Sequence, residues 1–144
     1  MNPGIQLICK VLGDNGCYFL SMCYIAERLT GIRADVIDDF TAAQARGLIG
    51  EDAFVLDAGK LFSMMAHATY TCLKAGPGHE LPGDYHMDPD ENEILRYEYT
   101  DAAGKVHAHF VVGDGQGSCW YDPMGKSESV RQGKVVSRRI LRRA

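Results

Sequence analysis

The chain divides into a first part with the apolar spacing of helices and a second part with the alternation of β-strands. Up to about residue 69, apolar residues recur mostly three or four positions apart. From Glu93 onward, the segments ILRYEYT, KVHAHFVVG, SCWYDP and KVVSRRIL are rich in β-branched and aromatic residues and are joined by polar connectors. Helices followed by strands predict an α+β fold in which N-terminal helices pack on a C-terminal antiparallel β-sheet.

The expected elements are as follows. Helices are predicted over residues 17–30, 34–49 (broken around Gly47) and 57–69, with Gly31 ending the first and Asp57 capping the third. Residues 5–12 are expected to form a short strand or an extended lead-in, residues 70–73 a short strand, and residues 76–92 a long loop. A length of 144 residues with 46% hydrophobic content suits one domain, spanning residues 1–144, around one core.

Charge and cysteine content narrow the function classes. A net charge of −4 gives no basic character that would favour nucleic acid or an anionic membrane surface. The N-terminus lacks the pattern of a secretory leader, and the apolar runs are too short to span a membrane, so we expect a cytoplasmic protein. Five widely spaced cysteines without a CxxC pair indicate reduced thiols rather than disulfides or a zinc site.

One of these cysteines, Cys17, has the position of a nucleophile. Residues Gly13 to Gly16 read as a loop, Asp14 or Asn15 can cap the helix that follows, and Cys17 falls in its first turn. Unpaired backbone amides and the positive end of the helix dipole favour a thiolate there. Cys23, in the middle of the same helix among apolar neighbours, lacks this advantage.

A histidine and an aspartate fall on neighbouring strands of the second part. If the loop of the hairpin is Asp114 to Gly117, His109 lies directly opposite Asp122. A tighter Asp114-Gly115 turn would instead pair His107 with Asp122, and His107 is therefore the reserve base. In either register a carboxylate can orient an imidazole, which is what a Cys-His-Asp triad requires.

The order of Cys17 in NGCYFLS, His109 in HAHFVVG and Asp122 in WYDPMG resembles the papain-like cysteine peptidases. It is most similar to the minimal bacterial and phage branch near the bacteriocin-processing (double-glycine leader) peptidases. The resemblance covers about Gly13 to Pro123. It implies a papain-like fold and a thiol protease that hydrolyses a peptide or isopeptide bond through an acyl-enzyme, with Cys17, His109 and Asp122 as the catalytic triad.

The chain departs from this family at the oxyanion donor. The family usually carries a glutamine six residues before the cysteine, where this sequence has Val11. Asn15 and Gln6 are the candidate replacements, beside the backbone amide of Cys17. Trp120 is a candidate wall of the cleft. The loop over residues 76–92 is a candidate flap that either covers the substrate or occupies the cleft as an inhibitor.

Other functions stay open at this point. The same triad would serve an acyl transferase, a transglutaminase-like cross-linker or a deamidase, and the frame without activity would serve as a binding module. The expected partner is a peptide or protein substrate, with no nucleic acid and no membrane, and the sequence gives no oligomeric state. The chemistry needs no cofactor and no metal, and the spacing of His79 and His86 matches no ligand pattern.

Overall fold

The computed structural model of the chain describes residues 3–144, and it confirms the α+β arrangement of N-terminal helices and a C-terminal antiparallel sheet. Residues 1 and 2 of the predicted domain lie outside the described residues. The helices are α1 (Pro3–Asn15), α2 (Cys17–Thr30), α3 (Val36–Ala45), α4 (Ala58–Ala66) and α5 (Glu128–Gln132). The strands are β1 (Tyr70–Ala75), β2 (Asn92–Thr100), β3 (Val106–Gly113), β4 (Cys119–Tyr121) and β5 (Lys134–Arg143).

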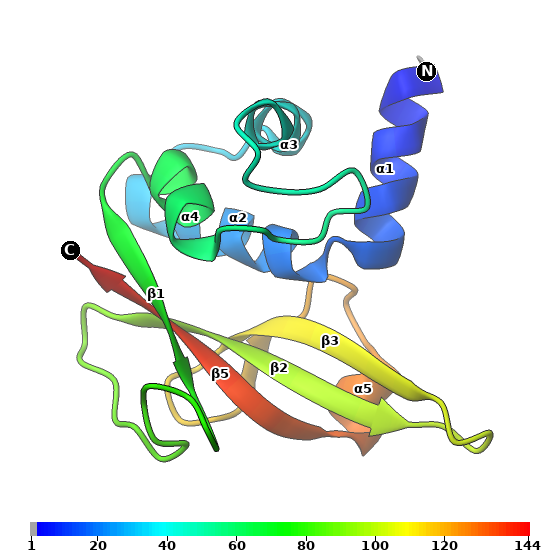
Figure 1. Cartoon of the computed structure of the whole chain (residues 1–144), viewed down its shortest axis with the longest axis vertical. Coiled ribbons are helices and arrows are strands. Elements are labelled where there is room, and N and C mark those ends of the chain that lie inside the picture. Colours follow the sequence, from blue (N-terminus) through cyan, green and yellow to red (C-terminus); the bar gives the residue numbers. More distant parts are fainter. Residues whose placement is uncertain (1–2) are drawn as a thin grey trace.

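The five strands form one sheet in the order β1-β5-β2-β3-β4, and all neighbouring pairs are antiparallel. Figure 1 shows α2 and α4 lying over one face of this sheet, with α3 above them and α1 standing away from the sheet. The main core fills the space between these helices and the sheet, and its centre includes Phe19, Met22 and Ile94, whose exposed fractions are all 0%. Each side chain buried to this degree stabilises the fold by about 1.5–3 kcal/mol.

A second, smaller core lies on the opposite face of the sheet. There Leu95, Tyr97 and Val111 pack with Val130 of α5. The sequence predicts a polar connector where the structure has the five residues of α5. Ser127 caps this helix by accepting a hydrogen bond from the backbone N–H of Val130. Helices therefore cover both faces of the sheet, α2 and α4 on one face and α5 on the other.

The N-terminal segment is where the expectation was wrong. Residues 5–12 are neither a strand nor an extended lead-in but the middle of α1, and Gly13 to Asn15 continue that helix instead of forming a loop. Ile5, Ile8 and Leu12 lie three and four residues apart, which is a helical spacing that a short apolar run conceals. The predicted helices over 34–49 and 57–69 are present as α3 and α4, and Asp57 caps α4 as expected.

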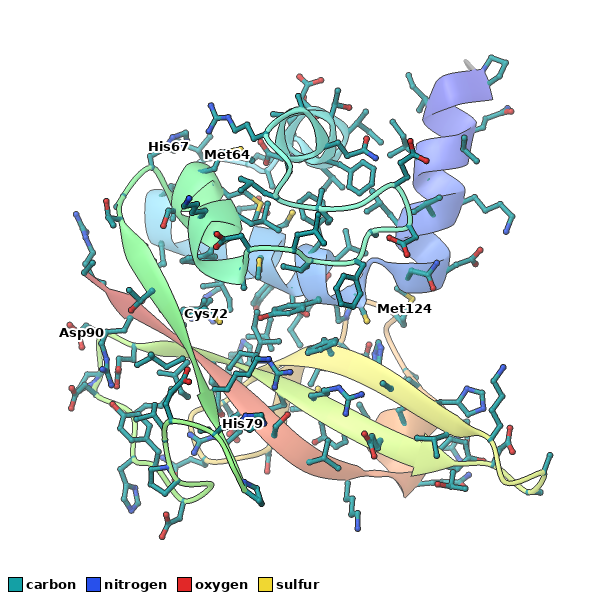
Figure 2. All side chains as sticks on the ribbon, viewed as in Figure 1. Met64, His67, Cys72, His79, Asp90 and Met124 are labelled. Carbon is teal, nitrogen blue, oxygen red and sulfur yellow. The ribbon has the colours of Figure 1, made fainter. Side chains whose placement is uncertain are left out.

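The loop over residues 76–91 is held against β5 by the side chains of Arg138 and Arg142. Arg138 donates from Nε to Glu93 Oε2 at 2.8 Å and from Nη1 to the Tyr85 carbonyl at 2.7 Å. Arg142 donates to Glu91, which also accepts from the hydroxyl of Tyr85. Figure 2 shows His79 and Asp90 on this loop, away from the helices. Among residues 3–144, no helix is long and apolar enough to cross a membrane.

Candidate active site

Cys17 is the first residue of α2, and a single glycine separates this helix from α1. The backbone N–H of Gly16 donates to the carbonyl of Leu12 at 2.8 Å, which closes α1, and the carbonyl of Gly16 accepts from Leu20, which opens α2. A Cβ at Gly16 would lie 2.5 Å from the Leu12 oxygen, so this junction requires glycine. Gly16 is the N-cap and makes no side-chain cap, so the expectation that Asp14 or Asn15 caps α2 was wrong.

Because no side chain caps α2, its first turn keeps backbone N–H groups available beside Cys17. Gly31 ends the helix in the left-handed conformation, as expected. Ser21 anchors the first turn by donating from Oγ to the carbonyl of Cys17 at 2.8 Å. The Cys17 side chain is half-buried.

The thiol meets the open edge of β3. β4 pairs with β3 at Val112 and Gly113, so no strand of the described residues lies beside the backbone of β3 near Phe110 on that side. There the N–H of Phe110 donates to Cys17 Sγ at 3.4 Å. The fold thus places the Cys17 thiol between the start of a helix and a free strand edge.

His109 and Asp122 come together as the sequence predicted, but by a different register. The cross-strand partners are Val112 with Tyr121 and Gly113 with Cys119, and neither predicted hairpin register occurs. Asp122 follows the last residue of β4, and its Oδ1 accepts from His109 Nε2 at 2.7 Å. The two side chains are 9% and 5% exposed. Since Asp122 takes Nε2, the ring nitrogen left to face the thiol is Nδ1.

Two further groups hold the carboxylate of Asp122. The backbone N–H of Met124 donates to Oδ1 at 2.9 Å, and the hydroxyl of Ser127 donates to Oδ2 at 2.9 Å. Figure 2 shows Met124 between the base of α1 and the sheet. The sequence reasoning missed Ser127, although a serine just before a short helix is a recognisable cap.

The protonation states follow from these contacts. Burial alone would raise the pKa of the Cys17 thiol, but its interactions with His109 and with the N–H groups of Phe110 and Tyr18 outweigh burial and lower that pKa. Burial opposes the protonation of His109, yet the contacts with Cys17 and Asp122 raise its pKa above the usual value. Burial likewise opposes ionisation of Asp122, but its hydrogen bonds lower its pKa overall. These opposite shifts favour a thiolate beside an imidazolium.

The other predicted site residues are distributed as follows. Asn15, the last residue of α1, lines the same cleft as Cys17. Gln6 is exposed, nine residues before Asn15 on α1, or about 14 Å along the helix, and it lies outside that cleft. His107 is bonded through Nε2 to Asp101 at 2.8 Å and is 42% exposed, so it does not meet Asp122.

Trp120 and the long loop lie outside the cleft as well. Trp120 is 60% exposed and donates from Nε1 to the hydroxyl of Tyr24 at 3.1 Å. No residue of the 76–91 loop lines the cleft that contains Cys17, so the loop does not form a flap over it. His79 and His86 are exposed on this loop, and the described residues contain no group of three side chains arranged to hold a metal ion.

The cleft itself has a volume of about 580 Å³ and lies between the sheet and the segment that connects α3 to α4. Cys17, Asn15 and Tyr18 form the end nearest α2. His109 and Asp122 do not line it, so the thiol stands between the cleft and the imidazole. This geometry allows a group held in the cleft to be attacked by sulfur from one side.

Fold and site together define a small α+β protein with a Cys-His-Asp trio at a helix N-terminus. Residues 6–143 match the family described as "Protein of unknown function, DUF261", and the chain belongs to this family. No curated protein and no solved structure matches the chain.

Proposed function

We propose that this protein is a papain-like cysteine hydrolase that cleaves a peptide or isopeptide bond through an acyl-enzyme. The observation that carries the proposal is the buried bond between His109 and Asp122, next to a thiol whose pKa is lowered. A hydrogen-bonded histidine–aspartate pair on its own would be ordinary. Its combination with Cys17 at the uncapped start of α2 supports a catalytic role.

In the proposed reaction, the Cys17 sulfur attacks the carbonyl carbon and forms a C–S bond. The oxyanion is stabilised by the backbone N–H of Cys17, with the side chain of Asn15 as the second donor. His109 gives its proton to the nitrogen as the C–N bond breaks, and the amine leaves. Water, deprotonated by His109, then attacks the thioester, releasing a carboxylic acid and the free thiol. Asp122 keeps the imidazole oriented throughout.

The test is digestion of a proteome-derived peptide library in water enriched in ¹⁸O, with the full chain and with the variant Cys17→Ala. Hydrolysis predicts new peptide ends whose carboxylates carry ¹⁸O, with the wild type alone. Uncut peptides in which a glutamine has become an ¹⁸O-labelled glutamate would indicate a deamidase instead, and peptides newly joined to an amine would indicate a transferase. If the two samples are identical, the hydrolase proposal is wrong.

A further inference from the structure

The cleft beside Cys17 has one apolar wall and one cationic floor. Phe54 and Leu56 line the wall and are 67% and 60% exposed. Lys74, Arg96 and Arg139 line the floor, on β1, β2 and β5 of the sheet. Arg96 is paired with Glu98, so its charge is compensated within the protein.

Arg139 is buried without a carboxylate partner. The residue is 8% exposed, Nη1 donates to the hydroxyl of Ser137 at 2.6 Å, and Nε has no hydrogen-bond partner in the part of the chain that the structure describes. Among residues 3–144, no acidic side chain forms an ion pair with it. An arginine buried to this extent is nearly always paired, because an uncompensated charge is costly away from water.

The groups that pack against Arg139 do not supply a negative charge. Phe110 lies under its guanidinium, with 5.4 Å between the Cζ atom and the ring centroid. Burial raises the pKa of Tyr18 and of Cys72, which keeps both groups neutral near pH 7. Figure 2 shows Cys72 at the level between the helices and the sheet, where these groups meet.

A second cation lies directly beside this one. Lys74 on β1 and Arg139 on β5 are cross-strand partners, and like charges placed directly opposite each other destabilise a sheet. Lys74 is exposed, and no described side chain forms an ion pair with it; Glu80 bonds its backbone N–H. The acidic residues of the cleft are engaged elsewhere, because Asp14 pairs with Lys10 and Asp52 accepts from the N–H of Phe54.

We propose that Lys74 and Arg139 bind a carboxylate of the peptide whose amide bond is presented to Cys17. This inference rests on the proposed function and adds a substrate class to it, namely peptides with a negative charge close to the scissile bond. A carboxylate between the two cations would offset their repulsion and give Arg139 a negatively charged partner. Arg139 and Lys74 would thus be substrate-binding residues and take no part in proton transfer.

Phe110 links the two parts of the cleft. Its backbone N–H contacts Cys17 Sγ, and its ring contacts Arg139. A substrate that contacts both Cys17 and Arg139 therefore passes over the side chain of Phe110. The carboxylate can come from an acidic side chain near the scissile bond or from the C-terminus of the peptide, and both present the same group to the cations.

The test uses alkylating probes, so it does not require a known substrate. The rate of Cys17 alkylation is measured by mass spectrometry with N-iodoacetyl-glycine, which carries a terminal carboxylate, and with N-iodoacetyl-glutamic acid α-amide, which carries a side-chain carboxylate. Each is compared with its neutral amide. We expect at least one charged probe to react about tenfold faster than its neutral counterpart, the fold-change that one charge-assisted hydrogen bond gives. The faster of the two identifies the source of the carboxylate.

Variants separate this inference from the proposed function. Arg139→Gln and Lys74→Gln should bring the ratio of charged to neutral rates down severalfold, whereas Lys105→Gln, at an exposed lysine outside the cleft, should not change it. Lys74 is exposed, so its variant remains informative even if Arg139→Gln does not fold. Equal rates for charged and neutral probes in the wild type would overturn the inference. Slow labelling by every probe with the ratio preserved would contradict the hydrolase and leave the carboxylate site standing.

Discussion

His109 donates from Nε2 to Asp122 Oδ1 at 2.7 Å, although the two residues are not cross-strand partners. Asp122 lies just beyond β4, where Met124 and Ser127 orient its carboxylate toward the imidazole. The trio therefore depends on the turn after β4 as much as on the sheet.

Replacing His109 should remove the reactivity of Cys17. In His109→Ala the thiol keeps its burial but loses the interaction that stabilises the thiolate, so its pKa should rise. We expect cleavage to fall by about 100- to 10,000-fold, the usual contribution of general acid–base catalysis. The matched control is His107→Ala, since His107 is bonded to Asp101 and should leave the rate unchanged. A loss of rate in the control instead would assign the base to His107.

Ser127 should act on the pH profile through Asp122. Ser127→Ala removes a hydrogen bond from the carboxylate and the cap of α5, costing about 0.5–2 kcal/mol of stability. Because Asp122 is then held less firmly, the raised pKa of His109 should decrease. The fall in activity at high pH should begin at lower pH, in a plot of cleavage rate against pH.

The control for Ser127 is another helix cap, Asp35, whose carboxylate accepts from the N–H of Asp38 at the start of α3. Asp35→Ala should cost similar stability and leave the pH profile in place. If the two variants have the same dependence of cleavage rate on pH, Ser127 acts only as a helix cap and does not affect His109.

The junction between α1 and α2 should tolerate no side chain at Gly16. A methyl group there meets the Leu12 carbonyl at 2.5 Å, so Gly16→Ala should cost about 1–3 kcal/mol and displace Cys17. Gly13→Ala is the matched control, because Gly13 is helical and has open space around its Cβ. It should stabilise the protein by about 0.5–1 kcal/mol. Urea unfolding measures both; a harmless Gly16→Ala would contradict the close contact.

The ion pair of Glu93 with Arg138 should be important for folding. The two side chains are 0% and 9% exposed, and Glu93→Gln leaves the buried charge of Arg138 without its partner. We expect a loss of about 3–5 kcal/mol in the free energy of unfolding. The exposed pair of Glu128 with Arg131 serves as comparison, and Glu128→Gln should cost at most about 1 kcal/mol. Similar losses in both variants would contradict the importance of the buried pair between β2 and β5.

Elements with strong local signals could be predicted from the sequence, and elements with short or mixed signals could not. The period of α4 and its Asp57 cap are both visible in the sequence, and so is the alternation in β2 and β3. In α1, the run IQLICKVL is too short and too apolar for its period to decide between helix and strand. The five residues of α5 depend on packing against the sheet, which local pattern does not show.

The candidate site, too, could be predicted from the sequence only in part. Cys17, His109 and Asp122 could be chosen because their residue types and order carry chemical meaning. The hairpin register could not, because the bond from the Asp114 N–H to the Ser118 carbonyl and a shift of register between Val112 and Gly113 give a pairing that matches neither alternative considered. The pairing of Lys74 with Arg139 joins residues 65 positions apart and depends on the strand order, which the sequence does not show.

The most direct test of the central claim is the rate of iodoacetamide labelling of each cysteine as a function of pH in the wild-type protein. The pKa of Cys17 is lowered, so its thiolate should form below the ordinary cysteine pKa of about 8.5. The pKa of His109 is raised, so the thiolate should lie beside a charged imidazole until His109 loses its proton. Cys17 should then label far faster than the exposed Cys9 at pH 7, while Cys23, whose pKa burial raises to about 12, stays unreactive. If Cys17 instead labels no faster than Cys9 at any pH, the thiolate–imidazolium pair does not form and the catalytic account is wrong.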